Sequence, residues 1–224
     1  MIGISDMISG GTGLYTLRET ARYARMHPHT VSRWFKGDDY CRKVFLLDES
    51  RIITFLDFVQ VLAVRNVRVH YPEISLQKIR DAITRASDQF DVSYPFARKH
   101  TTFVFDKEIW IRPTGQTIMQ ISGSQHGQKG MVPLLERFLK DISFDANTGL
   151  AEKYKAFERG KHKITMNPRM RFGEPLLDDC GYTPLTLFEA AKAEGSPEAA
   201  AKVYGVTPEQ VELCVDYCDY LEAA

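Results

Sequence analysis

The side chains best suited to chemistry in this sequence are basic and hydroxyl groups gathered between residues 18 and 43. They are Arg18, His29, Thr30, Ser32, Arg33, Lys36, Arg42 and Lys43. Guanidinium and ammonium groups pair with phosphates, and an arginine can also read guanine through two hydrogen bonds. From Leu14 to Phe45, seven basic residues face three acidic ones, although the whole chain is neutral with 29 of each. This local excess predicts nucleic-acid binding confined to one segment.

Other chemistry finds little support in the sequence. His27 and His29 could be paired as metal ligands, but they flank a proline in a predicted turn. The glycines at 10–13 are not followed by the Gly-Lys-Ser/Thr of a phosphate loop, and the nucleophile motifs of hydrolases are missing. Asp178 and Asp179 are adjacent, so they point in different directions and are expected to form a solvated turn. We therefore expect no enzyme, no metal and no cofactor.

The basic segment must be positioned by two short helices. Thr16 is a good N-cap with Glu19 three residues later, and this pattern predicts a helix that ends near Met26. A second helix is expected from Pro28 or Thr30 to a stop at Gly37. Two helices joined by a tight turn within about twenty residues make a helix-turn-helix, whose second helix enters the major groove of DNA.

This arrangement assigns a role to each candidate side chain. Val31 and Trp34 should face inward. His29, Thr30, Ser32 and Arg33 should present themselves to bases or phosphates, with Arg33 exposed. Arg18, Lys36, Arg42 and Lys43 should hold the DNA backbone, the last two from a small hairpin or wing between residues 40 and 53. The alternative is an ordinary helical corner with a solvated basic face. Because few phosphate contacts are available, we expect a homodimer to double them.

The remainder of the chain predicts further helices and short strands. Thr54 and Ser75 should each begin a helix, and strands are expected at 102–105, 108–111, 153–157 and 161–166, with a loop at 113–130 and an amphipathic helix at 131–144. Thr183, Ser196 and Thr207 each precede a proline, which predicts helices over 184–194, 197–204 and from 208 to about 221. The fold class is therefore mainly α with small β-hairpins (α+β).

The expected domain organisation has four parts. Residues 1–13 should be a flexible N-terminus, 14–112 a winged helix-turn-helix DNA-binding domain, 113–160 a linker with an amphipathic helix and short strands, and 161–224 a trihelical, helix-turn-helix-like domain. The three C-terminal helices carry acidic side chains, which would repel phosphate. We expect them to bind a protein, through self-association or a basic partner; the alternative is a capping subdomain without a partner.

The cellular location follows from what the sequence lacks. It has no apolar run long enough for a membrane span and no basic-then-apolar leader at its N-terminus. Its four cysteines, Cys41, Cys180, Cys214 and Cys218, fit neither a zinc motif nor a dense disulfide framework, so we expect them to be reduced. A soluble, cytoplasmic protein that does not contact a membrane is expected.

Several stretches together resemble a known family. Residues 15–24 (YTLRETARYA) and 30–34 (TVSRW) resemble the opening of MerR-like helix-turn-helix domains. Residues 54–59 and 75–80 resemble the helices that follow in VapB-type antitoxins of the two-domain sort. Residues 164–168, 171–175 and 204–211 resemble the small helical family of unknown function often fused at the C-terminus of these antitoxins.

This resemblance implies an antitoxin of a type II toxin-antitoxin system. Such a protein binds operator DNA, represses its own operon and neutralises a PIN-domain ribonuclease toxin. The alternative is a stand-alone transcriptional regulator whose C-terminal half dimerises or senses a ligand. A neighbouring reading frame for a small protein with spaced acidic metal ligands would favour the first hypothesis.

Overall fold

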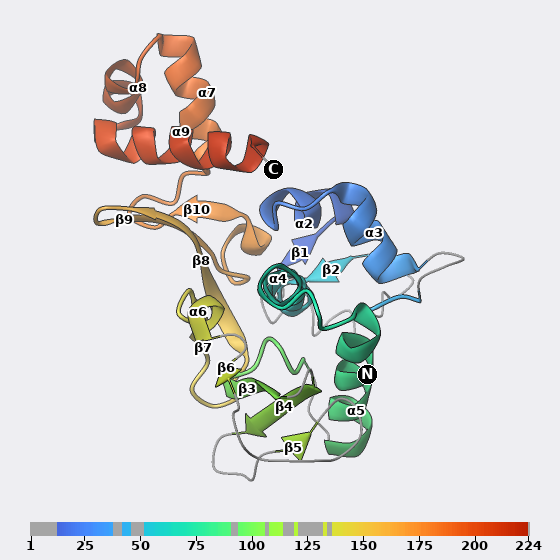
Figure 1. Cartoon of the computed structure of the whole chain (residues 1–224). Coiled ribbons are helices and arrows are strands. Elements are labelled where there is room, and N and C mark those ends of the chain that lie inside the picture. The colour runs from blue at the N-terminus through green and yellow to red at the C-terminus, as the bar shows by residue number, and fades with distance from the viewer. Residues whose placement is uncertain are drawn as a thin grey trace. The chain divides into compact units, whose positions relative to one another are not determined.

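The computed structural model describes residues 13–37, 42–45, 52–90, 94–105, 108–113, 119–120, 132–133 and 136–223. The fold is α+β, and its helices and strands are labelled in Figure 1. The chain divides into two compact units. The N-terminal unit is Tyr15–Glu152, and the C-terminal unit is built mainly from Lys153–Ala224.

The first helix of the N-terminal unit, α2 (Leu17–Tyr23), begins at the predicted capping box. The Thr16 hydroxyl accepts a hydrogen bond from the backbone N–H of Glu19 at 3.2 Å, and the Glu19 carboxylate accepts one from the N–H of Thr16 at 2.8 Å. The helix ends three residues before Met26, where we expected it to stop. The chain leaves the helix at Arg25, whose φ of +50° is rare for a residue with a side chain.

The second helix, α3 (Pro28–Lys36), has the predicted bounds. His27 is its N-cap, and the Nδ1 atom of His27 accepts a hydrogen bond from the N–H of His29 at 3.2 Å. Gly37, with φ of +73°, ends the helix. Val31, Trp34 and Phe35 are buried, which confirms the inward face expected for this helix.

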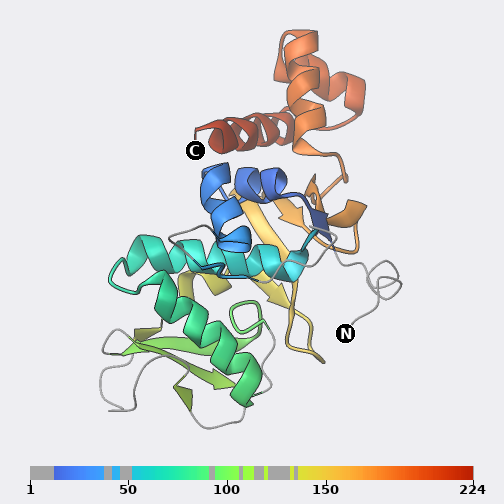
Figure 2. The ribbon, with the colours of Figure 1, turned by 90° about the vertical axis from the view of Figure 1, so that its right-hand side faces the viewer.

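The core of the N-terminal unit is centred on α4 (Phe55–His70), which the predicted cap Thr54 begins by sharing a capping box with Asp57. Phe58, Val61 and Val64 are fully buried, and the Phe58 ring lies 5.1 Å from that of Tyr15. The helix α5 (Leu76–Phe90) follows, also as predicted. Figure 2 shows α4 lying between the α2–α3 pair and α5.

The short strands β1 (Leu14–Tyr15) and β2 (Ile53–Thr54) pair with each other. The expected wing spans residues 40–53, of which 40–41 and 46–51 lie outside the described residues. At the far end of this range, Ile53 lies in β2, and the pairing of β2 with β1 links the start of α2 to the start of α4.

An antiparallel sheet follows in the order β5-β4-β3-β6, and β4 packs against α5. Its strands are β3 (His100–Phe105), β4 (Glu108–Pro113), β5 (Met119–Gln120) and β6 (Val132–Pro133). The pairing of Phe105 with Glu108 confirms the predicted hairpin.

The expected amphipathic helix over 131–144 is wrong for most of its length. Among the residues of this range that the structure describes, only α6 (Glu136–Leu139) is helical, and it lies between β6 and the strand β7 (Ile142–Phe144). Pro133 lies in β6, since proline fits an edge strand but lacks the N–H that a helix interior needs. The β-branched Ile142 and aromatic Phe144 favour a strand.

In the C-terminal unit, β9 (His162–Met166) pairs antiparallel with β8 (Ala151–Arg159) and with β10 (Pro175–Leu177). These bounds confirm the strands expected near 153–157 and 161–166. The turn between β8 and β9 contains Gly160, whose φ is +59°. A short 3₁₀ helix, η1 (Arg171–Gly173), lies between β9 and β10.

The three C-terminal helices have the predicted starts and ends: α7 (Pro184–Glu194), α8 (Pro197–Tyr204) and α9 (Pro208–Glu222). Thr183, Ser196 and Thr207 cap them as expected. Their shared core contains Ala190, Ala200, Ala201 and Val211. Among the described residues, every helix is too short or too polar to cross a membrane.

Candidate nucleic-acid interface

The outward side of the α2–α3 pair and the segment after it carries most of the predicted site residues. Arg18 on α2, His29 and Lys36 on α3, and Arg42 and Lys43 after α3 are exposed. Thr30 and Ser32 are half-buried on α3. Val31, Trp34 and Phe35 anchor the opposite side of the helix in the core, and this burial fixes which side chains of α3 face outward.

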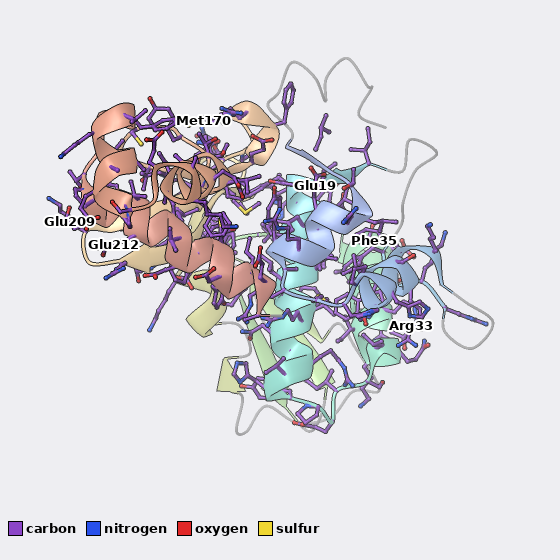
Figure 3. All side chains as sticks on the ribbon, turned by 90° about the horizontal axis from the view of Figure 1, so that it is seen from above. Glu19, Arg33, Phe35, Met170, Glu209 and Glu212 are labelled. Atoms are coloured by element: carbon purple, nitrogen blue, oxygen red, sulfur yellow. The ribbon has the colours of Figure 1, made fainter. Side chains whose placement is uncertain are left out.

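The exposure of Arg33 differs from the prediction, which placed its side chain at the surface. The side chain is half-buried, and its Nε atom is fully buried. Figure 3 labels Arg33 and Phe35 on α3. Arg33 precedes the buried Trp34 on α3, and the packing of α3 in the unit covers part of the Arg33 side chain, including the Nε atom of its guanidinium. Arg33 therefore has a packing role in addition to the predicted one.

The segment that follows α3 is tied back to the helix. The backbone N–H groups of Val44 and Phe45 both donate to the carbonyl oxygen of Trp34, at 2.6 and 3.0 Å. The Phe45 ring packs 5.2 Å from the Phe35 ring. These contacts satisfy a carbonyl group at the C-terminal end of α3. They also place Arg42 and Lys43 close to the end of α3.

Arg80 on α5 is a functional candidate that the sequence analysis missed. Its Nε donates to the carbonyl oxygen of Lys43 at 2.8 Å, and one Nη donates to that of Arg42 at 2.7 Å. The Gln77 side chain, one turn earlier on α5, accepts a hydrogen bond from the other Nη of Arg80. Arg80 thus fixes the backbone that carries two predicted DNA-binding side chains. Sequence offers no signal for it, because the partners are 37 and 38 residues away.

His27 and His29 lie on either side of Pro28 at the start of α3. The Nδ1 of His27 accepts a backbone hydrogen bond from the N–H of His29, so His27 serves as the helix cap. Within the described part of the chain, no three histidine, cysteine or acidic side chains gather closely enough to hold a metal ion. His29 remains exposed at the N-terminal end of α3, where the helix dipole and open N–H groups favour an anion.

In the C-terminal unit, part of the expected acidic surface is neutralised within the chain. Arg159 on β8 forms ion pairs with Glu212 at 3.0 Å and with Asp216 at 2.7 Å. Of the remaining α9 acids, Glu209, Asp219 and Glu222 are exposed.

Asp178 and Asp179 lie in the predicted turn, but both side chains also form hydrogen bonds within the unit. Asp178 accepts hydrogen bonds from Lys153 at 2.8 Å and from Thr165 at 3.0 Å. The Asp179 carboxylate contacts Nδ1 of the buried His162 and accepts a hydrogen bond from Gln210 at 3.3 Å. The hydrogen bond with His162, and then that with Gln210, lower the pKa of Asp179 below its usual value. This cluster connects the turn to β9 and to α9.

Three of the four cysteines lie in the part of the chain that the structure describes. Cys180 is an exposed free thiol, and Cys214 is a free thiol buried on α9 together with Cys218. Burial raises the pKa of Cys214 to about 12, so its thiol stays protonated and unreactive at neutral pH. Cys41 lies outside the described residues.

No family model matches the sequence. A stretch of 90 residues is 30% identical to a curated protein of Mycobacterium tuberculosis named "Putative antitoxin VapB45". The match covers 40% of this chain and only 37% of the length of that relative. It supports a distant relationship to an antitoxin-like protein.

The fold itself has a solved counterpart. The crystal structure of Rv2018 from Mycobacterium tuberculosis superposes with a TM-score of 0.62, covering 90% of this chain and 97% of the other, at 18% sequence identity. At this identity the likeness concerns the fold alone. This chain therefore shares the fold of Rv2018 and a distant sequence relationship with a protein named as an antitoxin.

Proposed function

We propose that this chain is the antitoxin of a type II toxin-antitoxin system, which binds operator DNA through α2 and α3 and neutralises a PIN-domain ribonuclease. The observation that carries the proposal is the outward side of the α2–α3 corner. His29 and Lys36 are exposed on α3, with Arg42 and Lys43 held at its end. The distant similarity to a protein named as an antitoxin supports the same function.

The mechanism of DNA binding follows from this arrangement. The N-terminal end of α3 enters the major groove, where His29, Thr30 and Ser32 meet base edges and phosphates. Lys36, Arg42 and Lys43 neutralise backbone phosphates and set the register of the helix. Arg18 contributes a further phosphate contact from α2. Because one copy offers few such contacts, two copies bind two half-sites about one helical turn of DNA apart.

The antitoxin role needs a second activity, the capture of a ribonuclease. An antitoxin of this kind is a regulatory protein without catalysis of its own. Its reading frame is expected beside one that encodes a small protein with spaced acidic metal ligands. If DNA binding is retained but no such neighbour exists, the chain is a stand-alone regulator instead.

The experiment that tests the DNA-binding function is a fluorescence-anisotropy titration of the full chain. The probes are a duplex from upstream of its own reading frame and a scrambled duplex of the same composition. We expect the upstream duplex to bind at least about 1000-fold more tightly, as specific sites do relative to non-specific DNA. Equal affinities for the two duplexes would reject an operator-binding role.

The toxin-binding function is tested separately. The chain is co-expressed with the neighbouring small protein, and the ribonuclease activity of the purified complex is compared with that of the small protein alone. We expect a stable complex in which cleavage of RNA is suppressed. A small protein that cleaves RNA equally well with and without the chain would show that the chain is no antitoxin.

A further inference from the structure

The most unusual surface feature outside the DNA-binding face is four consecutive exposed residues between β9 and β10: Arg169, Met170, Arg171 and Phe172. We refer to them as the tip. The Phe172 side chain is 69% exposed and that of Met170 is 49% exposed. Large apolar side chains that stand exposed together, rather than singly, mark surfaces that bind another molecule.

The backbone of the tip has a strained conformation that hydrogen bonds support. Arg171 and Phe172 have φ values of +44° and +56°, in the left-handed region that side chains disfavour. Hydrogen bonds hold this shape: the N–H of Met170 donates to the Asn167 carbonyl, and that of Gly173 to the Met170 carbonyl, both at 2.9 Å. Strain of this kind persists where function benefits from it. The aromatic side chain is thus presented without further ordering.

The composition of the tip indicates a protein partner. Arginine, methionine and aromatic residues are the types enriched at protein–protein interfaces, and buried aromatic anchors carry most of their affinity. The unit that carries the tip argues against DNA: residues 153–224 contain nine lysines and arginines and twelve acidic residues. A net negative unit repels phosphates. Within the tip, Arg171 is paired with Glu174 at 3.2 Å, so Arg169 is the cation that can attract a carboxylate of a partner.

Carboxylates beside an aromatic surface are present on the outer side of α9. Tyr220 is 39% exposed, and its ring lies over Phe157 with the centroids 5.2 Å apart. Asp219 and Glu222 flank it, and both are exposed. Methionine packs well on aromatic rings, and arginine pairs with carboxylates. Figure 3 shows Met170 apart from Glu209 and Glu212, which lie in the first half of α9.

We propose that the tip of one chain docks on the outer side of α9 of a second copy. Met170 and Phe172 cover Tyr220, while Arg169 pairs with Asp219 and Glu222. Because each copy carries both surfaces, a two-fold arrangement makes the contact twice. The inference rests on the proposed function in one respect. A dimer would serve DNA binding, because a helix-turn-helix protein binds two half-sites as a dimer.

The test is sedimentation velocity of the full chain without DNA, over about a hundred-fold range of concentration. The wild type should dimerise. The double variant Met170→Ser/Phe172→Ser should dimerise at least ten-fold more weakly, and Leu185→Ser, a change at another exposed apolar residue (47% exposed), should match the wild type. Far-UV circular dichroism confirms that each variant is folded.

A charge exchange identifies the receiving surface. Arg169→Glu and Asp219→Arg should each weaken the dimer, and the two together should restore it toward the wild type. Glu194→Arg, at an exposed acid at the end of α7, should leave the dimer unchanged.

A monomeric wild type, an unaffected double variant or a failed restoration would each overturn the proposal. A tip variant that dimerises normally but loses a toxin partner would do the same, because it would assign the tip to another protein. These measurements use no DNA, so their failure is distinct from a failure of operator binding.

Discussion

Arg80 on α5 donates a hydrogen bond from Nε to the carbonyl oxygen of Lys43 at 2.8 Å, and so connects α5 to the segment after α3. A second donor of the same guanidinium holds the Arg42 carbonyl at 2.7 Å. The fork-shaped geometry of arginine suits two neighbouring acceptors, which a lysine cannot bind in this way. Arg80 is therefore a positioning residue for the basic segment that follows α3.

This relationship predicts that Arg80→Lys weakens binding to the upstream duplex by about three- to ten-fold. The expected cause is a loosened 42–43 segment, because the charge is retained and the slope of log Kd against log salt should not change. Lys78→Met, which removes a charge from the same helix, is the matched control and should change affinity less. If Arg80→Lys binds as the wild type does, Arg80 does not position this segment.

The capping box of α2 predicts a stability effect. Thr16→Ala removes the hydroxyl that accepts from the Glu19 N–H and should lower the free energy of unfolding by about 1 kcal/mol. Thr16→Ser keeps the hydroxyl and serves as the control. Urea denaturation followed by circular dichroism measures both variants. Equal midpoints for Thr16→Ala and Thr16→Ser would show that the cap contributes nothing measurable.

The His162–Asp179 contact predicts a pH-dependent stability of the C-terminal unit. The pKa of Asp179 is lowered in the folded state, so its contribution is full above the pKa of an unfolded aspartate and is lost as the pH falls through the folded value. Asp179→Asn should therefore reduce Tm at pH 7, and its difference from the wild type should shrink below about pH 4. Glu194→Gln is the control. A Tm difference that is constant down to pH 3 would contradict this assignment.

The strained backbone of the tip predicts that one substitution at Phe172 can raise the stability of the folded chain and weaken the dimer. Glycine adopts the left-handed region without penalty, so Phe172→Gly should raise the free energy of unfolding by up to about 1 kcal/mol while it weakens the dimer. Phe172→Ala lacks the same side chain but keeps the strain, and it should weaken the dimer without the gain. Urea denaturation measures this at protein concentrations too low for dimerisation. A lower free energy of unfolding for Phe172→Gly would show that the Phe172 side chain stabilises the folded chain itself.

The sequence allowed prediction of features that depend on residues a few positions apart, but not of those that depend on residues far apart in the chain. Thr16, Thr54 and Thr207 cap helices through residues three positions away, so their starts were predictable. The inward face of α3 followed from spacing alone. The helix expected over 131–144 was wrong because β6 pairs with β3, some thirty residues earlier, and this pairing overrides local periodicity.

The parts of the site that escaped prediction depend on contacts distant in sequence or on backbone strain. Arg80 meets its acceptors across α4, and Asp179 meets His162 and Gln210 across 17 and 31 residues. Arg33 sat on the predicted polar face, yet its burial depends on how α3 packs in the unit. The left-handed φ of Phe172 has no signature in composition, because glycine is the usual marker of that conformation.

The most direct test of the account measures how affinity for the upstream duplex depends on salt in the wild type, Lys36→Ala and Arg42→Ala. Each variant loses one exposed cation from the helix-turn-helix and should bind more weakly, with a slope reduced by about 1 for each bound copy. Lys202→Ala, at an exposed lysine of α8, should keep the wild-type affinity and slope. If Lys36→Ala and Arg42→Ala also keep both, the α2–α3 corner is not the DNA-binding surface.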